Sequence, residues 1–280
     1  MTPRALLRQV TAEMTAAGVP DAQVDAAMLL SFITGQPMLN LQLDSWSQVS
    51  PEDEANLREL CRRRCSRTPL QYLTGRQSFL GRDFMVDERV LIPRPETELL
   101  AERAVSVLQS AGKGCRALDL CCGSGCLAVS LALEAPQCEV HAADLSSGAL
   151  DVTRANAAQL GAQVQLHQGD LFSALPEKLA FHLIVSNPPY IPADDCLQLQ
   201  PEVLREPMMA LDGGQDGYDF YRRIAREAPK HLLPGGTLLM ETGFDQAAGV
   251  MALCEQAGLI PVAIHEDYQH IPRMVEARRA

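Results

Sequence analysis

The chain has 280 residues, of which 47% are hydrophobic and 21% are charged, and its formal net charge is -11 at pH 7. This composition is typical of a globular protein and excludes collagen-like and intrinsically disordered chains. The length allows one large or two ordinary domains. The acidic balance disfavours binding to a polyanion such as DNA, because phosphate contacts need basic side chains.

The apolar runs are too short to span a bilayer, so we expect no membrane contact. The segment MTPRALLRQV at the start contains arginines but no sustained apolar stretch, so we expect no signal peptide. These two features predict a cytoplasmic protein.

Helical periodicity dominates the chain from Pro3 to about Arg67. The stretches ALLRQVTAEMTAAG, DAQVDAAMLLSFITG and PEDEANLRELCRRRCSR each begin or end on Asp, Pro or Gly, as helices do. The last stretch starts with Pro51 and three acidic residues and ends with arginines, which complements a helix dipole. We therefore predict a small helical domain over residues 1–75, acting either as a stabilising cap or as a docking platform.

The pattern changes after this domain. The segment 77–87, centred on Gly81 and Arg82, predicts a β-hairpin, and residues 76–92 are expected to link the two domains. From about Leu91 strands alternate with helices, which predicts a doubly wound α/β domain over residues 93–280. The predicted strands are 116–119, 138–143, 164–168, 181–186, 232–242, 259–265 and 274–277, and the predicted helices are 96–109, 126–133 and 245–258.

A glycine-containing loop follows the first of these strands and precedes a helix, which is typical of a cofactor site. Glycines let the backbone approach a ligand closely, and the helix start offers unpaired N–H groups. The candidate cofactor-binding residues here are Asp119, Cys121, Cys122, Gly123, Ser124 and Gly125. A NAD fingerprint would read G-x-G-x-x-G. Here its first glycine is absent, and the preceding Asp119 would repel a pyrophosphate but suit a cationic ligand.

Acidic residues also follow the next two strands. Asp144 stands 25 positions after Asp119 (144 minus 119), where a ribose diol is bound in Rossmann-like folds. Asp170 and Leu171 follow the third strand and are suited to contact an adenine. With Asn187 after the fourth strand, they predict one ligand-binding rim at the carboxyl ends of the strands.

The tetrapeptide Asn187-Pro188-Pro189-Tyr190 ends the apolar strand FHLIVS and predicts methylation of a planar nitrogen. The lone pair of such a nitrogen is delocalised, so an enzyme must hold its N–H groups and aim the lone pair at the methyl. The Asn187 side-chain oxygen and the Pro188 carbonyl are the expected acceptors, while the prolines restrict the backbone. Tyr190 is expected to form an aromatic wall. The alternative is an ordinary turn after a strand.

The arrangement of this tetrapeptide and the cofactor loop resembles the class I S-adenosylmethionine-dependent methyltransferases. Cys121 stands where their loop has its first glycine, which predicts a less sharp turn. Three longer segments resemble the HemK/PrmC family, the N5-glutamine methyltransferases of peptide chain release factors. They are 62–100 and 205–224, together with the NPPY tetrapeptide, and within the first of them LIPRPETE at 91–98 resembles the release-factor version of the family.

The resemblance implies a Rossmann-like, doubly wound sheet with an antiparallel last strand, plus the N-terminal helical domain as a docking platform for a protein substrate. It implies S-adenosyl-L-methionine as cofactor and the GGQ-loop glutamine of class I release factors as methyl acceptor. Asn187, Pro188, Pro189 and Tyr190 would be catalytic, and Asn187 would also contact the cofactor. Arg94 and Glu96 enter the site region only through this resemblance, and an ion pair between domains is the other reading of Arg94.

Three other functions remain open at this point. A sister group modifies a glutamine of a large-subunit ribosomal protein, and it shares both the NPPY tetrapeptide and the Cys-Cys-Gly-Ser-Gly-Cys loop. Adenine-N6 methyltransferases of nucleic acids also carry NPPY, but the acidic net charge disfavours DNA as a partner. A non-catalytic binding module is disfavoured because both motifs are intact.

Nine cysteines, an odd number, in a chain without an export signal predict reduced thiols. Zinc is the alternative, since Cys61 and Cys65 lie one helical turn apart and Cys121, Cys122 and Cys126 lie close together in the sequence. However, the chain has no C-x-x-C pair, and its six histidines form no pair at i, i+4 spacing. We therefore expect no metal site.

Overall fold

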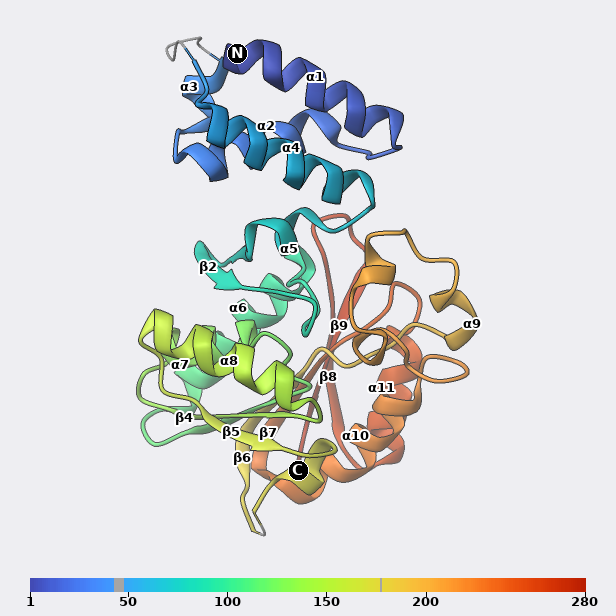
Figure 1. Cartoon of the computed structure of the whole chain (residues 1–280). Coiled ribbons are helices and arrows are strands. Elements are labelled where there is room, and N and C mark those ends of the chain that lie inside the picture. The colour runs from blue at the N-terminus through green and yellow to red at the C-terminus, as the bar shows by residue number, and fades with distance from the viewer. Residues whose placement is uncertain (43–47, 177) are drawn as a thin grey trace. The chain divides into compact units, whose positions relative to one another are not determined.

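The computed structural model describes residues 1–42, 48–176 and 178–280 (Figure 1). It divides into two compact units. The first contains Met1–Arg76 together with Gln200–Arg205, and the second contains Gln77–Leu199 and Glu206–Ala280. A short segment from the middle of the chain therefore belongs to the N-terminal unit, which the sequence pattern did not indicate.

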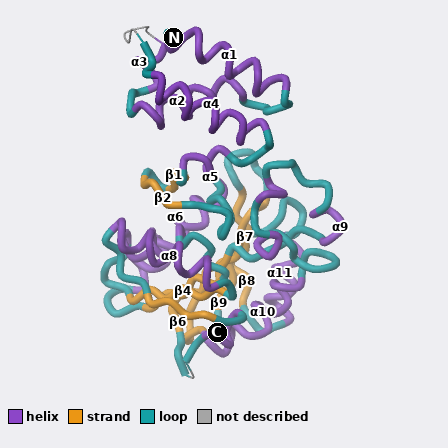
Figure 2. Tube along the Cα trace, viewed as in Figure 1, coloured by secondary structure: helices purple, strands orange, loops and turns teal. Residues whose placement is uncertain are grey.

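The first unit is helical (Figure 2). Its elements are α1 (Pro3–Ala16), α2 (Ala22–Thr34), α3 (Met38–Gln42), α4 (Pro51–Cys65), α5 (Leu70–Thr74) and the short 3-10 turn η2 (Val203–Arg205). The Ser50 hydroxyl accepts the Asp53 N–H at 3.0 Å and so caps α4, whose acidic first turn and basic last turn follow the predicted dipole pattern. The apolar faces of α1, α2 and α4 form one core that includes Leu6, Leu29 and Leu57.

Arginines hold the segment 200–205 within this unit. Arg64 is 5% exposed and pairs with Asp25 at 2.7 Å and with Glu202 at 2.8 Å, and Arg67 pairs with Glu202 at 2.5 Å. Burial opposes ionisation of Glu202, but hydrogen bonds from Arg67 and Arg64 outweigh it and lower the pKa of the carboxyl to about 2. The pairs are therefore intact at neutral pH.

Replacing Glu202 by Ala should lower the free energy of unfolding of this unit by about 3 kcal/mol at neutral pH, because the buried Arg64 would lose one of its two partners. The folded pKa lies below the unfolded value, so this stabilisation is present above the unfolded pKa and is lost as pH falls toward about 2. Urea unfolding at several pH values measures it. Glu59→Ala, which breaks an exposed pair with Arg62, is the matched control and should leave the midpoint unchanged. Equal effects of the two variants would contradict the assignment.

The second unit is built on a seven-stranded sheet in the order β5-β4-β3-β6-β7-β9-β8. Its strands are β3 (Arg116–Leu120), β4 (Glu139–Asp144), β5 (Gln165–Gln168), β6 (Phe181–Ser186), β7 (Leu232–Glu241), β8 (Ile260–Glu266) and β9 (Pro272–Arg278). The strands from β5 to β7 run parallel, whereas β9 is antiparallel to both β7 and β8. The predicted doubly wound sheet with an antiparallel last strand is confirmed.

Helices cover both faces of this sheet (Figure 1). The helical elements are α6 (Pro95–Ala111), α7 (Cys126–Glu134), α8 (Ser147–Leu160), η1 (Leu171–Ala174), α9 (Ala193–Cys196), η3 (Met208–Ala210), α10 (Asp219–His231) and α11 (Ala247–Gln256). On β3, Ala117 belongs to the core under α6, α7 and α8, and the next residue, Leu118, belongs to the core under α10 and α11. Successive side chains of a strand point to opposite faces of the sheet, so the one sheet contributes to two hydrophobic cores.

A hairpin of β1 (Arg76–Phe79) and β2 (Arg82–Met85) precedes the sheet, as predicted. Its turn places Leu80 and Gly81 at φ 47° and 71°, the left-handed geometry of a two-residue hairpin loop. Phe79 and Phe84 pack edge to face at 5.9 Å between ring centroids and are fully buried in the core under α6, α7 and α8. The hairpin is therefore anchored by aromatic packing.

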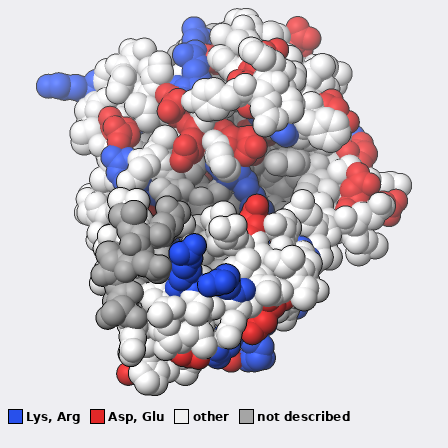
Figure 3. Space-filling view, turned by 90° about the horizontal axis from the view of Figure 1, so that it is seen from above, with Lys and Arg blue, Asp and Glu red and all other residues white. Residues whose placement is uncertain are grey.

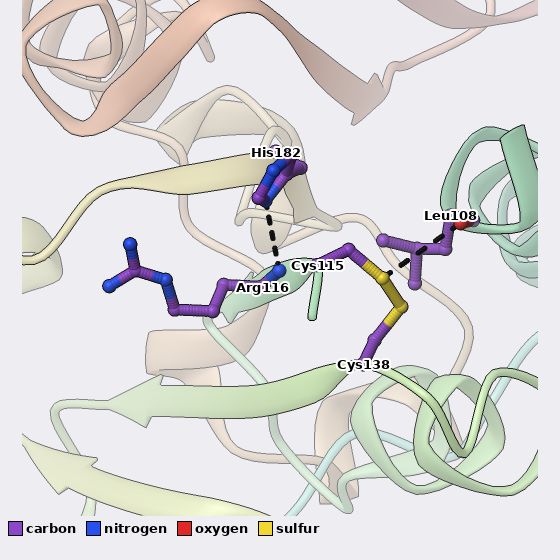
Figure 4. Close-up of a disulfide and its surroundings, with 5 residues drawn as sticks. All are labelled: Leu108, Cys115, Arg116, Cys138 and His182. Atoms are coloured by element: carbon purple, nitrogen blue, oxygen red, sulfur yellow. Dashed lines mark hydrogen bonds between the residues drawn. A yellow bond between two sulfur atoms is a disulfide. The ribbon is translucent and has the colours of Figure 1, made fainter. Parts of the chain in front are cut away.

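The expectation that all cysteines are reduced is wrong for two of them. Cys115 and Cys138 form a disulfide immediately before β3 and β4 (Figure 4). The register that pairs Arg116 with Glu139 places the two preceding residues opposite each other, with their Cα atoms 4.6 Å apart. Sequence spacing alone does not reveal a pairing that the strand register creates.

Alkylation of the denatured protein without reductant should label seven of the nine cysteines, and prior reduction should bring the number to nine. Mass spectrometry counts the labels. The variant Cys115→Ser should make Cys138 reactive without reduction. Full labelling of the unreduced wild-type protein would show that the bond is absent.

In the part of the chain that the structure describes, no helix has the length and apolar character needed to cross a membrane. The described residues also hold no group of three or more His, Cys, Asp or Glu side chains arranged to bind a metal ion.

Candidate active site

A cavity of about 470 Å³ opens at the carboxyl ends of β3, β4, β5 and β6. Parallel strands end at the same edge of a sheet, so the residues that follow them meet there. Of the residues singled out in the sequence, those that line the cavity are Cys121, Gly123, Asp144, Asp170, Leu171, Asn187 and Pro189. The remaining candidates, Asp119, Cys122, Ser124, Gly125, Pro188 and Tyr190, are not among the lining residues.

The cofactor loop turns sharply between β3 and α7. Cys121, Gly123 and Gly125 have φ values of 61°, 53° and 78°, all in the left-handed region. The expectation of a less sharp turn at Cys121 is therefore wrong, since Cys121 adopts a conformation that glycine favours. For a residue with a Cβ this costs about 1–2 kcal/mol, which the surrounding contacts must offset.

Two side chains of helix α8 hold this loop by hydrogen bonds. The Thr153 hydroxyl donates to the Gly123 carbonyl at 2.9 Å, and the Asn156 side chain donates to the Ser124 carbonyl at 2.9 Å. A Cβ at Gly125 would lie 2.5 Å from the Thr153 methyl carbon, so only glycine fits there. Ser124 and Gly125 thus shape the cofactor loop without lining the cavity.

Asp119 is a further residue that supports the loop without lining the cavity. The side chain is completely buried, and its Oδ2 accepts the Ala128 N–H of α7 at 3.0 Å. Burial raises the pKa of Asp119 to about 8, and its Oδ1 has no hydrogen-bond partner among the described residues. The structure places this carboxyl at the start of α7 and outside the cavity lining.

Asp144 lies at the end of β4 and lines the cavity. Its Oδ2 accepts the Gly123 N–H and its Oδ1 accepts the Ser146 N–H, both at 2.9 Å, while burial raises the pKa of the carboxyl. Each oxygen keeps a lone pair that can accept a further hydrogen bond. A Cβ added to Gly123 would meet no atom within 4 Å, so the loop leaves open space for a ligand beside Asp144.

A second wall of the cavity comes from residues that the site prediction missed. Arg223 of α10 pairs with Asp170 at 2.6 Å and lies over the Phe220 ring at 5.8 Å. Met208 and Met209 of η3 also line the cavity. The signal for these residues was the segment 205–224, which resembled the family, but the residue pattern did not show which side chains face a ligand.

Glu206 fixes this wall. The carboxyl is 5% exposed, accepts the Ile92 N–H at 3.0 Å and pairs with Arg94 at 2.6 Å. Arg94 thus forms an ion pair within the second unit and does not line the cavity. The polar pairs tie the segment before α6 to the segment that carries Met208, so the two sides of the cavity are held together.

Asn187 follows β6 and lines the cavity. Its side-chain Nδ2 donates to the Thr97 hydroxyl at 3.1 Å. Because the two polar atoms of a carboxamide lie on opposite edges, this bond leaves Oδ1 turned away from Thr97 and able to accept a hydrogen bond. Pro188 and Pro189 are buried, and the Tyr190 carbonyl accepts the Gln246 Nε2–H at 3.0 Å. Tyr190 packs against the core under α10 and α11.

The buried Asp119 generates a pH dependence of stability. Because its folded pKa of about 8 lies above the unfolded value, the folded state retains a proton that the unfolded state loses, and stability falls as pH rises between the two values. Asp119→Asn should remove this decline, so that the urea midpoints of variant and wild type diverge from about pH 5 to about pH 8. Asp151→Asn, in an exposed part of α8, controls for the loss of one negative charge. Parallel curves for wild type and Asp119→Asn would contradict the assignment.

The mixed sheet, the glycine loop after its first strand and the acidic rim define a class I methyltransferase. Residues 97–214 match the family model of the methyltransferase small domain, and residues 5–75 match that of the PrmC N-terminal domain. The chain belongs to the release factor glutamine methyltransferase family, and its methyl donor is S-adenosylmethionine.

Two curated relatives show the extent of the similarity. The release factor glutamine methyltransferase of Geobacter sulfurreducens is 43% identical over 262 residues, covering 93% of this chain and 91% of the relative. The one from Deinococcus radiodurans is 41% identical over 280 residues, covering 100% and 99%. The family resemblance seen in the sequence is confirmed.

Solved structures support the fold. A methyltransferase from Pyrococcus furiosus aligns with a TM-score of 0.55 at 18% identity, covering 72% of this chain and 91% of its own. The 16S rRNA N2 G1207 methyltransferase of Thermus thermophilus, solved with AdoMet and guanosine, aligns with a TM-score of 0.50 at 18% identity, covering 73% and 50%. At this identity the likeness speaks for the fold alone.

Proposed function

We propose that this chain transfers the methyl group of S-adenosylmethionine to the side-chain amide nitrogen, N5, of the glutamine in the GGQ loop of class I release factors. The observation that carries the proposal is the orientation of Asn187. Its nitrogen is bound by Thr97, and its oxygen is left as an acceptor in the cavity. The names of relatives that match nearly the whole chain support the same acceptor.

The acceptor chemistry explains why an oxygen is needed at this position. A carboxamide nitrogen is a poor nucleophile because its lone pair is delocalised into the carbonyl. The Asn187 Oδ1 and the Pro188 carbonyl would accept its two N–H bonds, hold the amide plane and direct the nitrogen toward the methyl group. Orientation and exclusion of water would then supply most of the rate enhancement. No general base is needed before transfer, since the proton can leave afterwards.

The residues around the cavity fit the methyl donor, whose sulfonium is cationic. Asp144 offers oxygen lone pairs to a ribose diol, and the backbone of Cys121 and Gly123 offers a close approach for the methionine portion. Asp170 and Leu171 would contact the adenine. The donor supplies an activated methyl, and the protein supplies binding and alignment.

A protein substrate fits the charge of the chain better than a nucleic acid does. On the face drawn in Figure 3, acidic and basic side chains are interspersed, and the residues drawn there form no continuous basic patch. With a net charge of -11, this supports a protein acceptor over an adenine in DNA. We propose that the helical unit docks the protein substrate and that the enzyme acts in the cytoplasm, where release factors work.

Asn187→Ala should reduce methyl transfer to a purified release factor at least a hundredfold, because the acceptor amide would lose the group that orients it. Labelled methyl incorporation, followed by mass spectrometry of the modified peptide, measures the effect. Cofactor affinity, measured by calorimetry, should stay within a few fold. Normal turnover by this variant would remove the main support for the mechanism.

Asp144→Ala is the matched comparison, because it should weaken cofactor binding while leaving the acceptor-binding groups in place. Offering the release factor, the ribosomal protein and DNA in parallel separates the three candidate substrates. Methylation of the ribosomal protein or DNA in place of the release factor would refute the proposed acceptor.

A further inference from the structure

Three side chains from separate elements form a hydrogen-bonded chain behind the cavity. Asn187 Nδ2, after β6, donates to the Thr97 hydroxyl at 3.1 Å, and this hydroxyl donates to Glu241 Oε2 at 2.7 Å. Thr97 lies in the first turn of α6 and is 2% exposed, and Glu241 ends β7 and is 3% exposed. Neither residue is among those that line the cavity.

The chemistry of the three groups determines which atom donates and which accepts in each of these two hydrogen bonds. An ionised carboxylate accepts hydrogen bonds only, so Glu241 takes the single hydroxyl proton of Thr97. The Thr97 oxygen then has only lone pairs to offer to Asn187, so the carboxamide must turn its NH₂ toward Thr97. Its oxygen consequently faces the cavity. Glu241 thus sets the orientation of the Asn187 amide through the Thr97 hydroxyl.

We propose that Thr97 and Glu241 are positioning residues for methyl transfer, which act by holding the Asn187 carboxamide with its oxygen toward the acceptor nitrogen. This inference rests on the proposed function for its effect on catalysis. Its structural content, the direction of the amide, does not depend on the substrate.

Protonation of Glu241 would remove the preference of the Asn187 carboxamide for one orientation. A protonated carboxyl donates to the Thr97 oxygen and frees the hydroxyl proton for Asn187 Oδ1, so the carboxamide can turn its NH₂ into the cavity. There the NH₂ would meet the N–H groups of the acceptor and repel them. The ionised form of Glu241 is therefore the active one.

The surroundings of Glu241 place this change near neutral pH. Burial raises the pKa of Glu241 to about 7, partly opposed by hydrogen bonding with Thr97 and Asn187. The charged or titratable groups that interact with Glu241 are Glu96 of α6, Arg273 of β9, Cys126 of α7, Tyr190 after β6 and Tyr221 of α10. Of these, the Tyr221 hydroxyl donates to the backbone carbonyl of Glu241 at 3.1 Å, so it does not compete for the carboxylate. The Asn187 side chain also interacts with the Glu241 carboxyl. An ionised carboxylate can accept only from the Asn187 NH₂, so this interaction favours the same orientation of the amide.

The first test replaces the hydroxyl that links the two partners. Thr97→Val keeps the shape of the side chain and should lower kcat about tenfold to a hundredfold, with cofactor Kd within twofold of wild type. Thr97→Ser restores a hydroxyl and should recover kcat to within about threefold. A kcat for Thr97→Val equal to that of wild type would overturn the proposal, as would a parallel loss in Thr97→Ser.

Thr242→Val is the matched control. Thr242 is the next residue after Glu241, is completely buried, and has a hydroxyl without a hydrogen-bond partner among the described residues. The same substitution at this position should leave kcat unchanged. A fall in kcat as large as that of Thr97→Val would show that the loss comes from disturbed packing and not from the hydrogen-bonded chain.

The second test is the pH profile. The kcat of the wild type should rise with pH through about 7 and then level off, because the ionised Glu241 is the active form. Glu241→Gln cannot ionise and has both a donor and an acceptor, so its kcat should be lower and should lose this step. A step that persists unchanged in Glu241→Gln would refute the role of Glu241.

A third measurement separates this inference from the proposed substrate. The side-chain amide signals of Asn187, assigned by their loss in Asn187→Ala, can be followed by NMR without any acceptor. They should shift in Thr97→Val and, in the wild type, with pH through about 7, while remaining in place in Thr97→Ser. If the wild type fails to methylate a release factor, the proposed acceptor is wrong and these signals still decide the positioning. Signals that do not move in Thr97→Val would refute it.

Discussion

The parallel register of β3 with its two neighbours is the constraint on which the site depends. Leu120 pairs with Ala143 of β4 on one side and with Ser186 of β6 on the other. The three strands therefore end at nearly the same level, and the chain leaves the sheet there at Cys121, just after Asp144, and at Asn187. A shift of one strand would separate the groups proposed to bind the cofactor from the group proposed to hold the acceptor.

Buried polar side chains keep the loops at this edge in place. Asp144 accepts N–H groups from Gly123 and Ser146, and Asn156 bonds both to the loop at Ser124 and to the hairpin at Met85. Hydrogen bonds of this kind have a directional geometry, and leaving their buried partners unpaired is costly. The loops are consequently held by bonds to the adjacent strands and helices, while the backbone of Gly123 stays open to the ligand.

The same principle operates at Asn187, where it bears on the proposed mechanism. A carboxamide is nearly symmetric in shape, so packing alone does not distinguish its oxygen from its nitrogen. Only a hydrogen-bond partner with a defined donor and acceptor character can do so. At Asn187 that partner is Thr97, and Glu241 defines the character of Thr97 in turn.

The sequence by itself determined the sheet, the cofactor loop and the residues that follow the strands, because alternation, glycines and acidic strand ends are local patterns with local physical causes. Only the tertiary structure decided how Thr97 and Glu241 meet Asn187, how Cys115 meets Cys138, and that Glu202 belongs with the helical unit. It also showed that Asp119 and Ser124 hold the loop in place by hydrogen bonds without lining the cavity. Arg223 and Met208, in contrast, line the cavity. These contacts join residues that are far apart along the chain, and strand register and helix packing bring them together, so no local pattern records them.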